Sequence, residues 1–423
     1  MWGASAMNAA WAMYRFFAPG LGALAPWARL LASPAERPLW NERMGIATME
    51  GGCHAWVHSA SLGEAVAVGP LVNELLALQP AARLYLTATT RTGRARLNAM
   101  GRPVSLAPID SPQAARRFFH GVQPERLFLV ETELWPHWLL RAQTQRVPVA
   151  ILSARLSERS MRRYRMLGSG LRRLVHGLDA VLCQSEQDRS RWLALGSRPE
   201  RTAISGNLKH DALPSRLADR GTGRVRLKLD RHRPLLVLGS LRPGEARTVV
   251  EAWRSLPEAT RREWQVVAVP RHAHAASEIR EEAFRAGITD AGRDLPGADA
   301  WRWDERAGVL NDYYAAAEVA IVCGSFGPYH GHNPMEPAAC GCAVITGPNH
   351  QSQLQAVRAL QRCGAIDVVQ DAAGLVQALS RLTADRESRE AQGARALEAV
   401  RSLRGATRRA VGQLAAWSLW PAA

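Results

Sequence analysis

Short β-rich runs alternate with amphipathic segments of helix length over most of the chain, and this alternation constrains the fold more than any other feature. A first series of such runs covers residues 55–58, 84–87, 127–130, 149–152 and 181–183. Parallel strands need long crossover connections, and helices then cover both faces of the sheet. The first series therefore predicts a doubly wound α/β domain.

A second series of β-rich runs predicts a second domain of the same class. Its runs cover residues 234–238, 265–269, 319–322 and 343–346. Ligands bind at the carboxyl ends of the strands in such sheets, so two facing sheets predict a site in an interdomain cleft. At 423 residues the chain is long enough for two such domains. We predict an N-terminal segment, a Rossmann-like domain, a polar linker, and a second Rossmann-like domain with C-terminal helices, at 1–40, 41–213, 214–233 and 234–423.

The charge balance indicates an anionic partner. Lys+Arg totals 54 against 38 Asp+Glu, which gives a formal net charge of +16. Nucleic acid, an anionic membrane surface and phosphorylated small molecules all fit this excess, and an arginine-rich genome would produce part of it without any function. A nucleic-acid-binding protein should show a basic helix or an aromatic stacking platform. The arginines here are dispersed, so no nucleic-acid partner is expected.

No metal site is predicted from cysteine or histidine. The six cysteines are scattered, mostly in apolar runs, and Cys340 and Cys342 lack the spacing and the second pair of a zinc site. The histidines His330, His332 and His350 have no carboxylate that completes a compact ligand set.

The first 34 or so residues predict a segment at a membrane interface. Arg15 and Arg29 are its only charged residues, and it carries several aromatic residues such as Trp2, Trp11 and Phe16. Proline and glycine interrupt it, so no apolar run approaches the roughly 20 residues that a membrane span needs. An interfacial helix with aromatic anchors fits this composition. A helix packed into the core is the alternative.

The first chemically informative turn follows the run at 55–58 and contains Ser61-Leu62-Gly63-Glu64. Glu64 falls in the first turn of the expected helix, at the carboxyl end of a strand. A glutamate there complements the helix dipole, which is worth about 0.3–1 kcal/mol. The functional alternative is a general base, because partial burial raises the pKa of a carboxylate toward neutrality.

The second half offers two candidate turns for a phosphorylated ligand. Residues 238–245 repeat the strand, turn and helix start of the first half and add Arg242, although every βα unit has such a turn. Residues 323–338 are more specific: Asn333 is the expected N-cap, Pro334 the first helical residue and Glu336 its capping partner. Alternatively, Glu336 accepts hydrogen bonds from ribose hydroxyls while backbone amides approach the ligand.

The sequence favours a mechanism without a metal. No Asp-x-Asp motif occurs, which a glycosyltransferase that holds its nucleotide through a divalent cation usually shows. No cofactor is expected. A departing phosphate must then be neutralised by side chains and helix ends. The candidates are Lys209, Arg242, and Arg271 with His272, and Lys209 stands out because lysine is rare in this chain.

The chain carries a series of motifs whose order and spacing resemble those of one family, the 3-deoxy-D-manno-octulosonic acid (Kdo) transferases of the lipid A pathway. The motifs begin near Asn41-Glu42-Arg43-Met44-Gly45 and extend beyond Gly347-Pro348-Asn349-His350. They include residues 61–64, 87–93, 131–136, 154–157, 206–209, 239–242, 270–272 and 331–337. Two departures stand out: Ser153, where the family commonly has asparagine, and His330, where it often has glycine.

The resemblance implies a two-domain GT-B fold at the cytoplasmic face of the inner membrane, either monotopic or anchored by its N-terminus. It implies a cytidine monophosphate-Kdo (CMP-Kdo) donor, a lipid A precursor as acceptor, and inversion without a metal. The first domain would bind the acceptor and the second the nucleotide sugar. Another nucleotide-sugar transferase or a sugar-nucleotide epimerase is the alternative, but the turn at 61–64 and the aromatic N-terminus argue against the epimerase.

By matching position, Glu64 would be the base, Glu336 would hold the ribose and Glu133 would shape the cleft. The remaining implied contacts follow the same motifs. The implied acceptor-binding residues are Ser61, Gly63, Arg91 and Glu133. The implied donor-binding residues are Lys209, Ser240, Arg242, Arg271, His272, Ser325, Gly331, Asn333 and Glu336.

Overall fold

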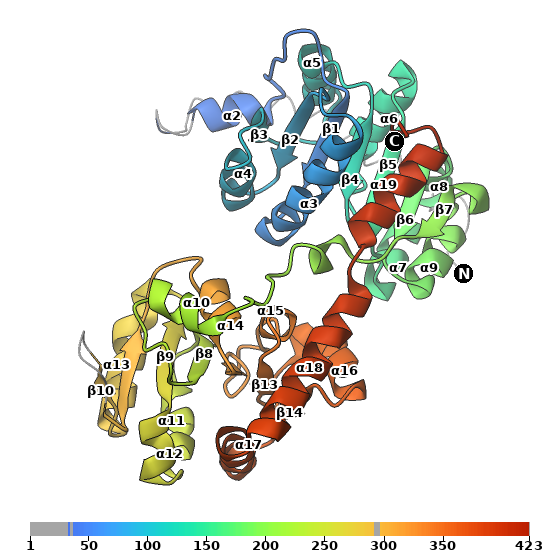
Figure 1. Ribbon diagram of the computed structural model, residues 1–423. Helices are drawn as coiled ribbons and strands as arrows, with labels where there is room; N and C mark the ends of the chain where they lie inside the picture. The colour runs from blue at the N-terminus through green and yellow to red at the C-terminus, as the bar shows by residue number, and fades with distance from the viewer. Residues whose placement is uncertain (1–32, 34–36, 292–296, 423) are drawn as a thin grey trace. The chain divides into compact units, whose positions relative to one another are not determined.

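The computed structural model describes residues 33, 37–291 and 297–422 and divides them into two compact units. The first unit comprises the described residues up to 212 together with 403–422, and the second comprises those of 213–402. Each unit is built on a parallel sheet of seven strands with helices on both faces (Figure 1). The two Rossmann-like sheets of the predicted α/β, GT-B class are therefore confirmed.

The sheet of the first unit has the spatial order β3-β2-β1-β4-β5-β6-β7. Its strands are β1 (Ala55–Ser59), β2 (Leu84–Ala88), β3 (Val104–Leu106), β4 (Leu127–Val130), β5 (Val149–Ala154), β6 (Ala180–Cys183) and β7 (Thr202–Ile204). The order reverses between β1 and β4. In doubly wound sheets this reversal opens a crevice at the carboxyl ends of the two strands.

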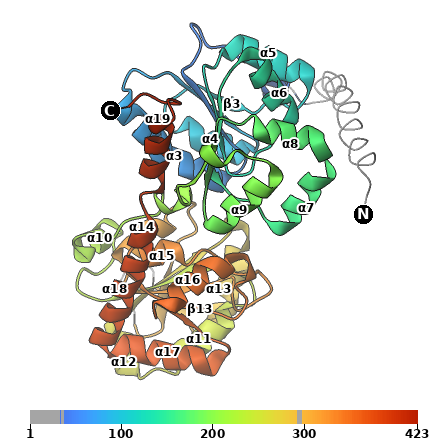
Figure 2. The ribbon, with the colours of Figure 1, turned by 90° about the vertical axis from the view of Figure 1, so that its right-hand side faces the viewer.

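Both faces of this sheet are buried under helices. Neighbouring side chains of a strand point to opposite faces, so Trp56 belongs to one core while Ala55 and Val57 belong to the other. The Trp56 side packs against α5 (Pro112–Val122), α6 (Pro136–Gln145), α8 (Gly168–His176) and α9 (Glu186–Leu195). The opposite side packs against α3 (Leu62–Leu78), α4 (Arg91–Asn98) and α19 (Ala406–Ala416), and Figure 2 shows α19 beside α3. The other helical elements of this unit are α2 (Arg37–Arg43), α7 (Glu158–Met166), η1 (Pro199–Arg201) and η2 (Leu208–His210).

The sheet of the second unit has the order β10-β11-β9-β8-β12-β13-β14. Its strands are β8 (Leu235–Leu241), β9 (Gln265–Pro270), β10 (Thr289–Asp290), β11 (Ala300–Trp303), β12 (Val319–Val322), β13 (Ala343–Thr346) and β14 (Ile366–Val368). Here the order reverses between β8 and β12, which again places a crevice at two carboxyl ends. Gly239 is needed in β8, because a Cβ at this position would lie 1.8 Å from the hydroxyl of Tyr314.

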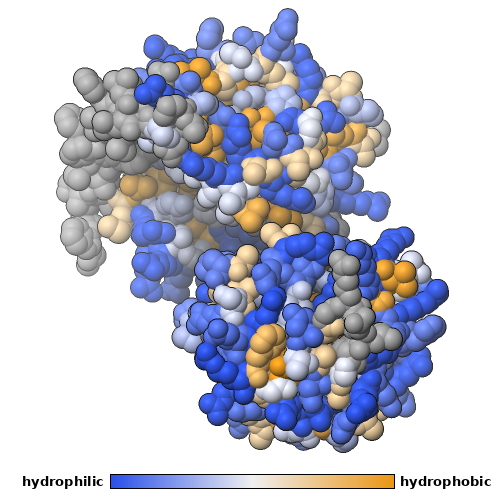
Figure 3. Space-filling model, turned by 90° about the vertical axis from the view of Figure 1, so that its left-hand side faces the viewer, coloured by the Kyte–Doolittle hydropathy of each residue, from blue (hydrophilic) through white to orange (hydrophobic). Residues whose placement is uncertain are grey.

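Helices cover both faces of the second sheet as well. One face packs against α11 (Ala246–Arg254), α13 (Ala276–Arg285) and α17 (Ala372–Ala384). The other helices are α10 (Arg220–Arg226), α12 (Glu258–Glu263), α14 (Leu310–Ala316), α15 (Met335–Ala339), α16 (Leu354–Arg362), α18 (Arg386–Leu403), η3 (Ala273–Ala275) and η4 (Gln351–Gln353). The surface of this unit shown in Figure 3 is mostly hydrophilic, with apolar side chains in small separate spots.

The expected strands are all present, and the structure adds five that the sequence pattern did not indicate. The additional strands are β3, β7, β10, β11 and β14. They have two to four residues; β3, β7, β10 and β14 are the outermost strands of the two sheets, and β11 lies next to β10. Several of their residues are only partly buried, so they lack the continuous apolar run that marks a central strand.

Two stretches differ from the expected domain boundaries. The segment expected to be a linker contains α10, where Arg224 is buried against Glu318 and the carbonyl of Ala316. Residues 403–422, expected in the second domain, pack on the first unit instead. There Trp420 Nε1 donates to the carbonyl of Leu75 over 3.1 Å inside the core. The apolar face of a helix that packs on the core of the other unit leaves no local signal of its destination.

The predicted interfacial segment at 1–34 lies outside the described residues, apart from Ser33. None of the helices in the described ranges combines the length and the hydropathy needed to cross a bilayer.

Candidate active site

Glu64 lies at the carboxyl end of β1, beside the point where the first sheet reverses its order. Ser61 caps α3, and its Oγ accepts a hydrogen bond from the Glu64 N–H over 3.3 Å. The Glu64 carboxylate in turn accepts from the N–H of Ala60 over 2.6 Å and from Ser61 Oγ over 2.9 Å. Glu64 therefore lies in the first turn of the helix, as expected. The residue remains 8% exposed, so these hydrogen bonds do not seal the carboxylate from a ligand.

The electrostatic surroundings favour the protonated form of Glu64. Burial raises the pKa of this carboxyl group, and the nearby charge of Glu131 raises it further, followed by that of Glu133. The hydrogen bonds from Ala60 and Ser61 oppose the shift. A carboxylate with a raised pKa is a stronger proton acceptor when ionised, which suits a general base.

Glu131 connects the carboxylates to Lys209. It directly follows β4 and adopts the left-handed conformation, with φ of 65°. Its Oε1 lies 2.5 Å from Lys209 Nζ. Lys209 sits on η2, and a Cβ at Gly63 would lie 3.9 Å from Lys209 Cε. The predicted phosphate ligand Lys209 thus lies beside the Glu64 turn, in the first unit.

Ser153 holds the short helix that carries Lys209. Its Oγ accepts hydrogen bonds from the N–H of Leu208 over 3.2 Å and from Gln184 Nε2 over 3.1 Å. The φ of Ser153 is 55°, a conformation that asparagine adopts more readily than most non-glycine residues. The departure from the family pattern at this position therefore falls where the backbone itself favours asparagine.

Glu133 is fixed by aromatic and imidazole neighbours. Its Oε2 accepts from Trp135 Nε1 over 2.8 Å and lies 3.6 Å from His58 Nε2. His58 is fully buried, with Nδ1 2.9 Å from Thr87 Oγ1, and burial lowers its pKa. His58 is therefore a neutral imidazole at neutral pH.

Arg91 begins α4, at the carboxyl end of β2, and is exposed. The first turn of α4 touches the loop before Glu64, because a Cβ at Gly93 would lie 3.4 Å from the carbonyl carbon of Ser61. Arg43 is close enough for its charge to interact with that of Arg91. The predicted acceptor-binding residues therefore gather at one edge of the first sheet.

The second unit assembles a cationic group at the carboxyl ends of β8 and β9. We use this name for Arg242 and Arg271, and His272 and His332 lie beside them. The guanidinium of Arg242 stacks on the ring of Tyr329 at 4.2 Å. Burial lowers the pKa of His332 to about 4, and the charges of Arg271, Arg242 and His272 contribute. His332 is thus neutral at pH 7, and its buried Nε2 has no hydrogen-bond partner in the described chain.

Glu245 fixes the loops around the cationic group. Its fully buried carboxylate accepts hydrogen bonds from the N–H groups of Arg242 over 3.0 Å, Gly324 over 2.7 Å and Phe326 over 2.8 Å. Burial raises the pKa of Glu245, and these backbone hydrogen bonds oppose the shift. The carboxylate therefore joins the turn after β8 to the loop after β12.

Two of the predicted donor-binding residues near this loop are engaged within the fold. Ser325 Oγ donates to the carbonyl of Val322 over 2.7 Å and accepts from the N–H of Gly347 over 2.8 Å. Ser240 lies within β8 and has a φ of 61°, at the point where the register of β8 with β9 shifts. Ser325 therefore fixes the loop after β12, and Ser240 marks an irregularity near the end of β8.

The helix start near Glu336 differs slightly from the expected one. α15 begins at Met335, and Pro334 precedes it, one residue later than predicted. The N-cap is therefore Pro334 and not Asn333. Asn333 still contacts the helix start, because its Oδ1 accepts from the N–H of Met335 over 3.1 Å and its Nδ2 donates to Glu336 Oε1 over 3.3 Å. Burial raises the pKa of Glu336, and Asn333 and the charge of Arg271 oppose the shift. Glu336 is thus held beside the cationic group.

Gly331 completes this part of the site. It has a φ of 79°, and a Cβ there would lie 2.9 Å from the Cα of His350. Only glycine combines that backbone with so close an approach. Lys209 apart, the predicted donor-binding residues all lie in the second unit.

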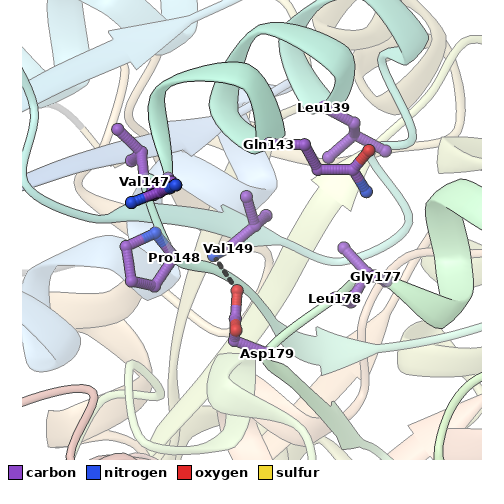
Figure 4. Close-up of a pocket in the computed structure, with 9 residues that line it drawn as sticks. Leu139, Gln143, Val147, Pro148, Val149, Gly177, Leu178 and Asp179 are labelled. Atoms are coloured by element: carbon purple, nitrogen blue, oxygen red, sulfur yellow. Dashed lines mark hydrogen bonds between the residues drawn. The ribbon is translucent and has the colours of Figure 1, made fainter.

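A cavity of about 270 Å³ in the first unit lies away from these residues (Figure 4). Its lining includes Gln143, Gly177 and Asp179, and Asp179 Oδ2 accepts from the N–H of Val149 over 2.9 Å. Val149 is the first residue of β5, so the cavity opens at the amino edge of the sheet. Ligands of doubly wound sheets bind at the carboxyl edge, and none of the predicted site residues line this cavity.

Across the described ranges, no group of three or more His, Cys, Asp or Glu side chains is arranged to hold a metal ion.

Comparison with known proteins identifies the family. Residues 39–212 match the sequence family described as 3-deoxy-D-manno-octulosonic-acid transferase (kdotransferase). The 3-deoxy-D-manno-octulosonic acid transferase of Bordetella pertussis is 36% identical over 385 residues, which cover 86% of this chain and 87% of that protein. The chain belongs to the Kdo transferase family. The predicted enzyme class, a glycosyltransferase, is thereby confirmed.

Other relatives agree with the family and the fold. The Kdo transferase of Haemophilus influenzae is 30% identical over 389 residues, covering 89% of this chain and 91% of that protein. The crystal structure of UDP-GlcNAc 2-epimerase from Neisseria meningitidis bound to UDP-GlcNAc is similar in fold, with a TM-score of 0.58 at 13% identity. That alignment covers 85% of this chain and 99% of the epimerase. Epimerases thus share the fold, whereas the sequence relatives are transferases.

Three residues of this Kdo transferase family member stand in the candidate site without having been predicted. They are Glu131, Glu245 and His332. Each lies in a motif that the sequence singles out, but nothing local distinguishes a glutamate that ties two loops together from one that faces a ligand. The contacts that define their roles come from segments distant in the chain, such as Lys209 for Glu131 and Gly324 for Glu245.

Proposed function

We propose that the protein transfers Kdo from CMP-Kdo to a hydroxyl group of a lipid A precursor, with inversion at the anomeric carbon. The observation that carries this proposal is Glu64, a buried carboxylate with a raised pKa at the switch point of the first sheet. Glu64 accepts the proton of the acceptor hydroxyl as its oxygen attacks the anomeric carbon. The bond from that carbon to the phosphate oxygen breaks, and cytidine monophosphate departs with the electron pair.

The cationic group is suited to the departing phosphate. Arg242 and Arg271 offer charge. Neutral His332 has a buried nitrogen that lacks a partner among the described residues and can therefore serve a ligand oxygen. Glu336, held by Asn333, is placed to accept from the ribose hydroxyls. Lys209, held by its pair with Glu131, is the third cation that we assign to the departing phosphate.

We assign the charge compensation to side chains and not to a divalent cation, since the chain has no Asp-x-Asp motif. In the same way the first unit, with Ser61, Gly63, Arg91 and Glu133, is assigned to the acceptor, and the second unit to the donor. Arg91 is exposed and charged, which suits a phosphorylated disaccharide.

The acceptor is a lipid, and we propose that the protein works at the cytoplasmic face of the inner membrane. The aromatic residues and two arginines of segment 1–34 support binding to an anionic membrane surface. Deleting residues 1–34 should lower binding to anionic vesicles and activity on vesicle-embedded acceptor, while activity on detergent-dispersed acceptor persists. Equal loss in both assays would contradict an interfacial role.

The function is tested by incubating the full chain with CMP-Kdo and a tetraacylated lipid A precursor, followed by mass spectrometry of the lipid. The expected result is a mass increase by one or more Kdo units, unchanged by a chelator. Activity that a chelator stops and magnesium restores would contradict the metal-free mechanism. Conversion of a free nucleotide sugar without any gain of mass by the lipid would favour the epimerase alternative.

A further inference from the structure

The second unit carries another basic region, at the opposite edge of its sheet from the candidate site. A cavity of about 750 Å³ opens there. Its wall includes Pro234, Glu318 and Gly341, which lie within two residues of the starts of β8, β12 and β13. Because these strands are parallel, their carboxyl ends, with Arg242 and Ser325, lie at the other edge. The cavity is therefore separate from the proposed donor site.

Arginine dominates the wall of this cavity, which contains three more arginines than carboxylates. The arginines come from the segment before α10, from α10 and the turn after it, and from α18. They are Arg216, Arg220, Arg224, Arg231, Arg386 and Arg389. The carboxylates are Asp219, Glu318 and Glu390.

Both oxygens of the central carboxylate, that of Glu318, already have partners within the fold. Glu318 Oε1 pairs with Arg224 and lies 3.8 Å from Arg220 Nη1, while its Oε2 accepts from the N–H of Leu235 over 2.8 Å. Arg220 also donates to the carbonyl of Gly341 over 2.8 Å, yet its buried Nε has no partner in the described chain. Guanidinium donors thus exceed the acceptors that the cavity supplies.

The arginines of α18 and of the segment before α10 add to this excess. Arg389 stacks on Trp264 at 5.0 Å, and its Nε is likewise buried without a partner among the described residues. Arg386 is exposed and pairs with Glu390 over 2.8 Å. Arg216 is exposed and forms no ion pair within 4 Å in the part of the chain that the structure describes. Like charges are thus crowded around this cavity.

The frame of the cavity is rigid. A Cβ at Gly393 would lie 2.4 Å from the carbonyl oxygen of Gly341, so α18 lies directly on the loop before β13. Gln392 Nε2, on the same helix, donates to the carbonyl of Val344 over 3.0 Å. The arginines therefore project from elements held in fixed register.

We propose that this cavity binds an anion with phosphoryl groups, independently of the sugar donor. Guanidinium groups match phosphoryl oxygens in paired hydrogen bonds, and their spread from α10 to α18 suits more than one phosphoryl group. The volume falls within the range of about 300–1,000 Å³ that small-molecule sites occupy. The phosphoryl groups belong either to a free polyphosphate or to a phospholipid headgroup.

The test uses inorganic pyrophosphate as the probe and isothermal titration calorimetry of the full chain. The proposed donor site is silenced in every sample by Arg242→Ala and Arg271→Ala. In this background pyrophosphate should still bind, and adding Arg216→Glu with Arg386→Glu should weaken binding by about tenfold or more. Both arginines are exposed, so the substitutions should leave the fold intact.

The matched control is Arg262→Glu with Arg285→Glu in the same background. These arginines are also exposed, belong to the same unit, and form pairs with Glu258 and Glu281 at a spacing of four residues. The control carries the same net charge and should bind pyrophosphate as the background does.

A parallel assay uses vesicles of phosphatidylcholine, with and without phosphatidylglycerol. It distinguishes a phospholipid headgroup from a free polyphosphate as the ligand. Loss of binding to anionic vesicles in the Arg216 and Arg386 variant, but not in the control, identifies a headgroup. A pyrophosphate effect without a vesicle effect identifies a free anion. If the two variants behave alike with both probes, the cavity is not an anion site and the proposal is wrong.

Discussion

Two glutamates occupy matching places in the two units and have different surroundings. Glu64 follows β1 and Glu245 follows β8, and each of these strands borders the reversal of its sheet. Both side chains lie at the start of a helix in a βα turn. Glu64 accepts one backbone and one hydroxyl hydrogen bond and faces Glu131 and Glu133, whereas Glu245 accepts from three backbone N–H groups.

The position in the βα turn therefore does not determine what each glutamate does. The number of hydrogen bonds that the fold donates to the carboxylate, and its exposure, determine it. Glu245 is completely buried and joins two loops, so it cannot act on a ligand without breaking them. Glu64 is 8% exposed and lies among like charges, so its ionised form remains reactive. We therefore interpret Glu64 as the base and Glu245 as a positioning residue, and each prediction below tests this division.

The largest effect is expected from Glu64→Gln. An amide keeps the shape and the cap but cannot accept the acceptor's proton, so turnover should fall by at least about 10²-fold. The fold should not lose stability at neutral pH, because the native state disfavours the charge that the substitution removes. Turnover by the Kdo mass assay and unfolding by denaturant are the measurements, and Glu74→Gln on the same helix is the control. Near-native turnover in Glu64→Gln would end the assignment.

The main effect of Glu245→Gln should be a lower free energy of unfolding. The new amide places N–H groups opposite backbone N–H groups, so at least one buried donor is left unsatisfied, at about 1–3 kcal/mol. The free energy of unfolding should fall by this amount, and the KM for the donor should rise more than kcat falls. Glu251→Gln, in the exposed pair with Arg247, should change the unfolding free energy by less than about 0.5 kcal/mol. An effect confined to kcat, with stability unchanged, would give Glu245 a chemical role.

The smallest effect concerns the loop that Glu245 holds. His330 has a φ of 61°, and the family often has glycine at this position. Left-handed backbone costs a non-glycine residue about 1–2 kcal/mol, part of which the entropy of glycine offsets. His330→Gly should therefore stabilise the protein by up to about 1 kcal/mol, measured by denaturant unfolding. His120→Gly, inside α5, should instead destabilise it by a similar amount. Loss of stability in His330→Gly would show that the imidazole contacts outweigh the strain.

The central strands and the turns that follow them were predictable, because buried parallel strands are continuous apolar runs. The sheet edges were not. β10, for example, is two exposed residues, Thr289 and Asp290, which only the pairing with β11 makes a strand. α10 was hidden for a similar reason: its glycines and arginines suggest a linker, and only the contact of Arg224 with Glu318 reveals a packed helix.

Some features of the candidate site could likewise be predicted from the sequence, and others could not. Glu64 and Glu336 could be predicted because each stands beside a helix start with a distinctive sequence. The contacts that set their pKa values could not, since Glu131 and Arg271 come from other βα turns that the fold brings close to them. The two departures from the family pattern, Ser153 and His330, both have positive φ, a conformational fact that a single sequence does not contain.

The central claim is that Glu64 is a base whose pKa is raised by burial and by the charge of Glu131. The most direct test is the single-turnover rate of Kdo transfer as a function of pH, for the wild-type protein and Glu131→Gln. A base must be ionised, so the rate should fall as the pH drops through the raised pKa of Glu64. Removing the charge of Glu131 lowers that pKa, so the acid limb of the profile should move to lower pH. An acid limb that stays in place, or moves to higher pH, would contradict the account.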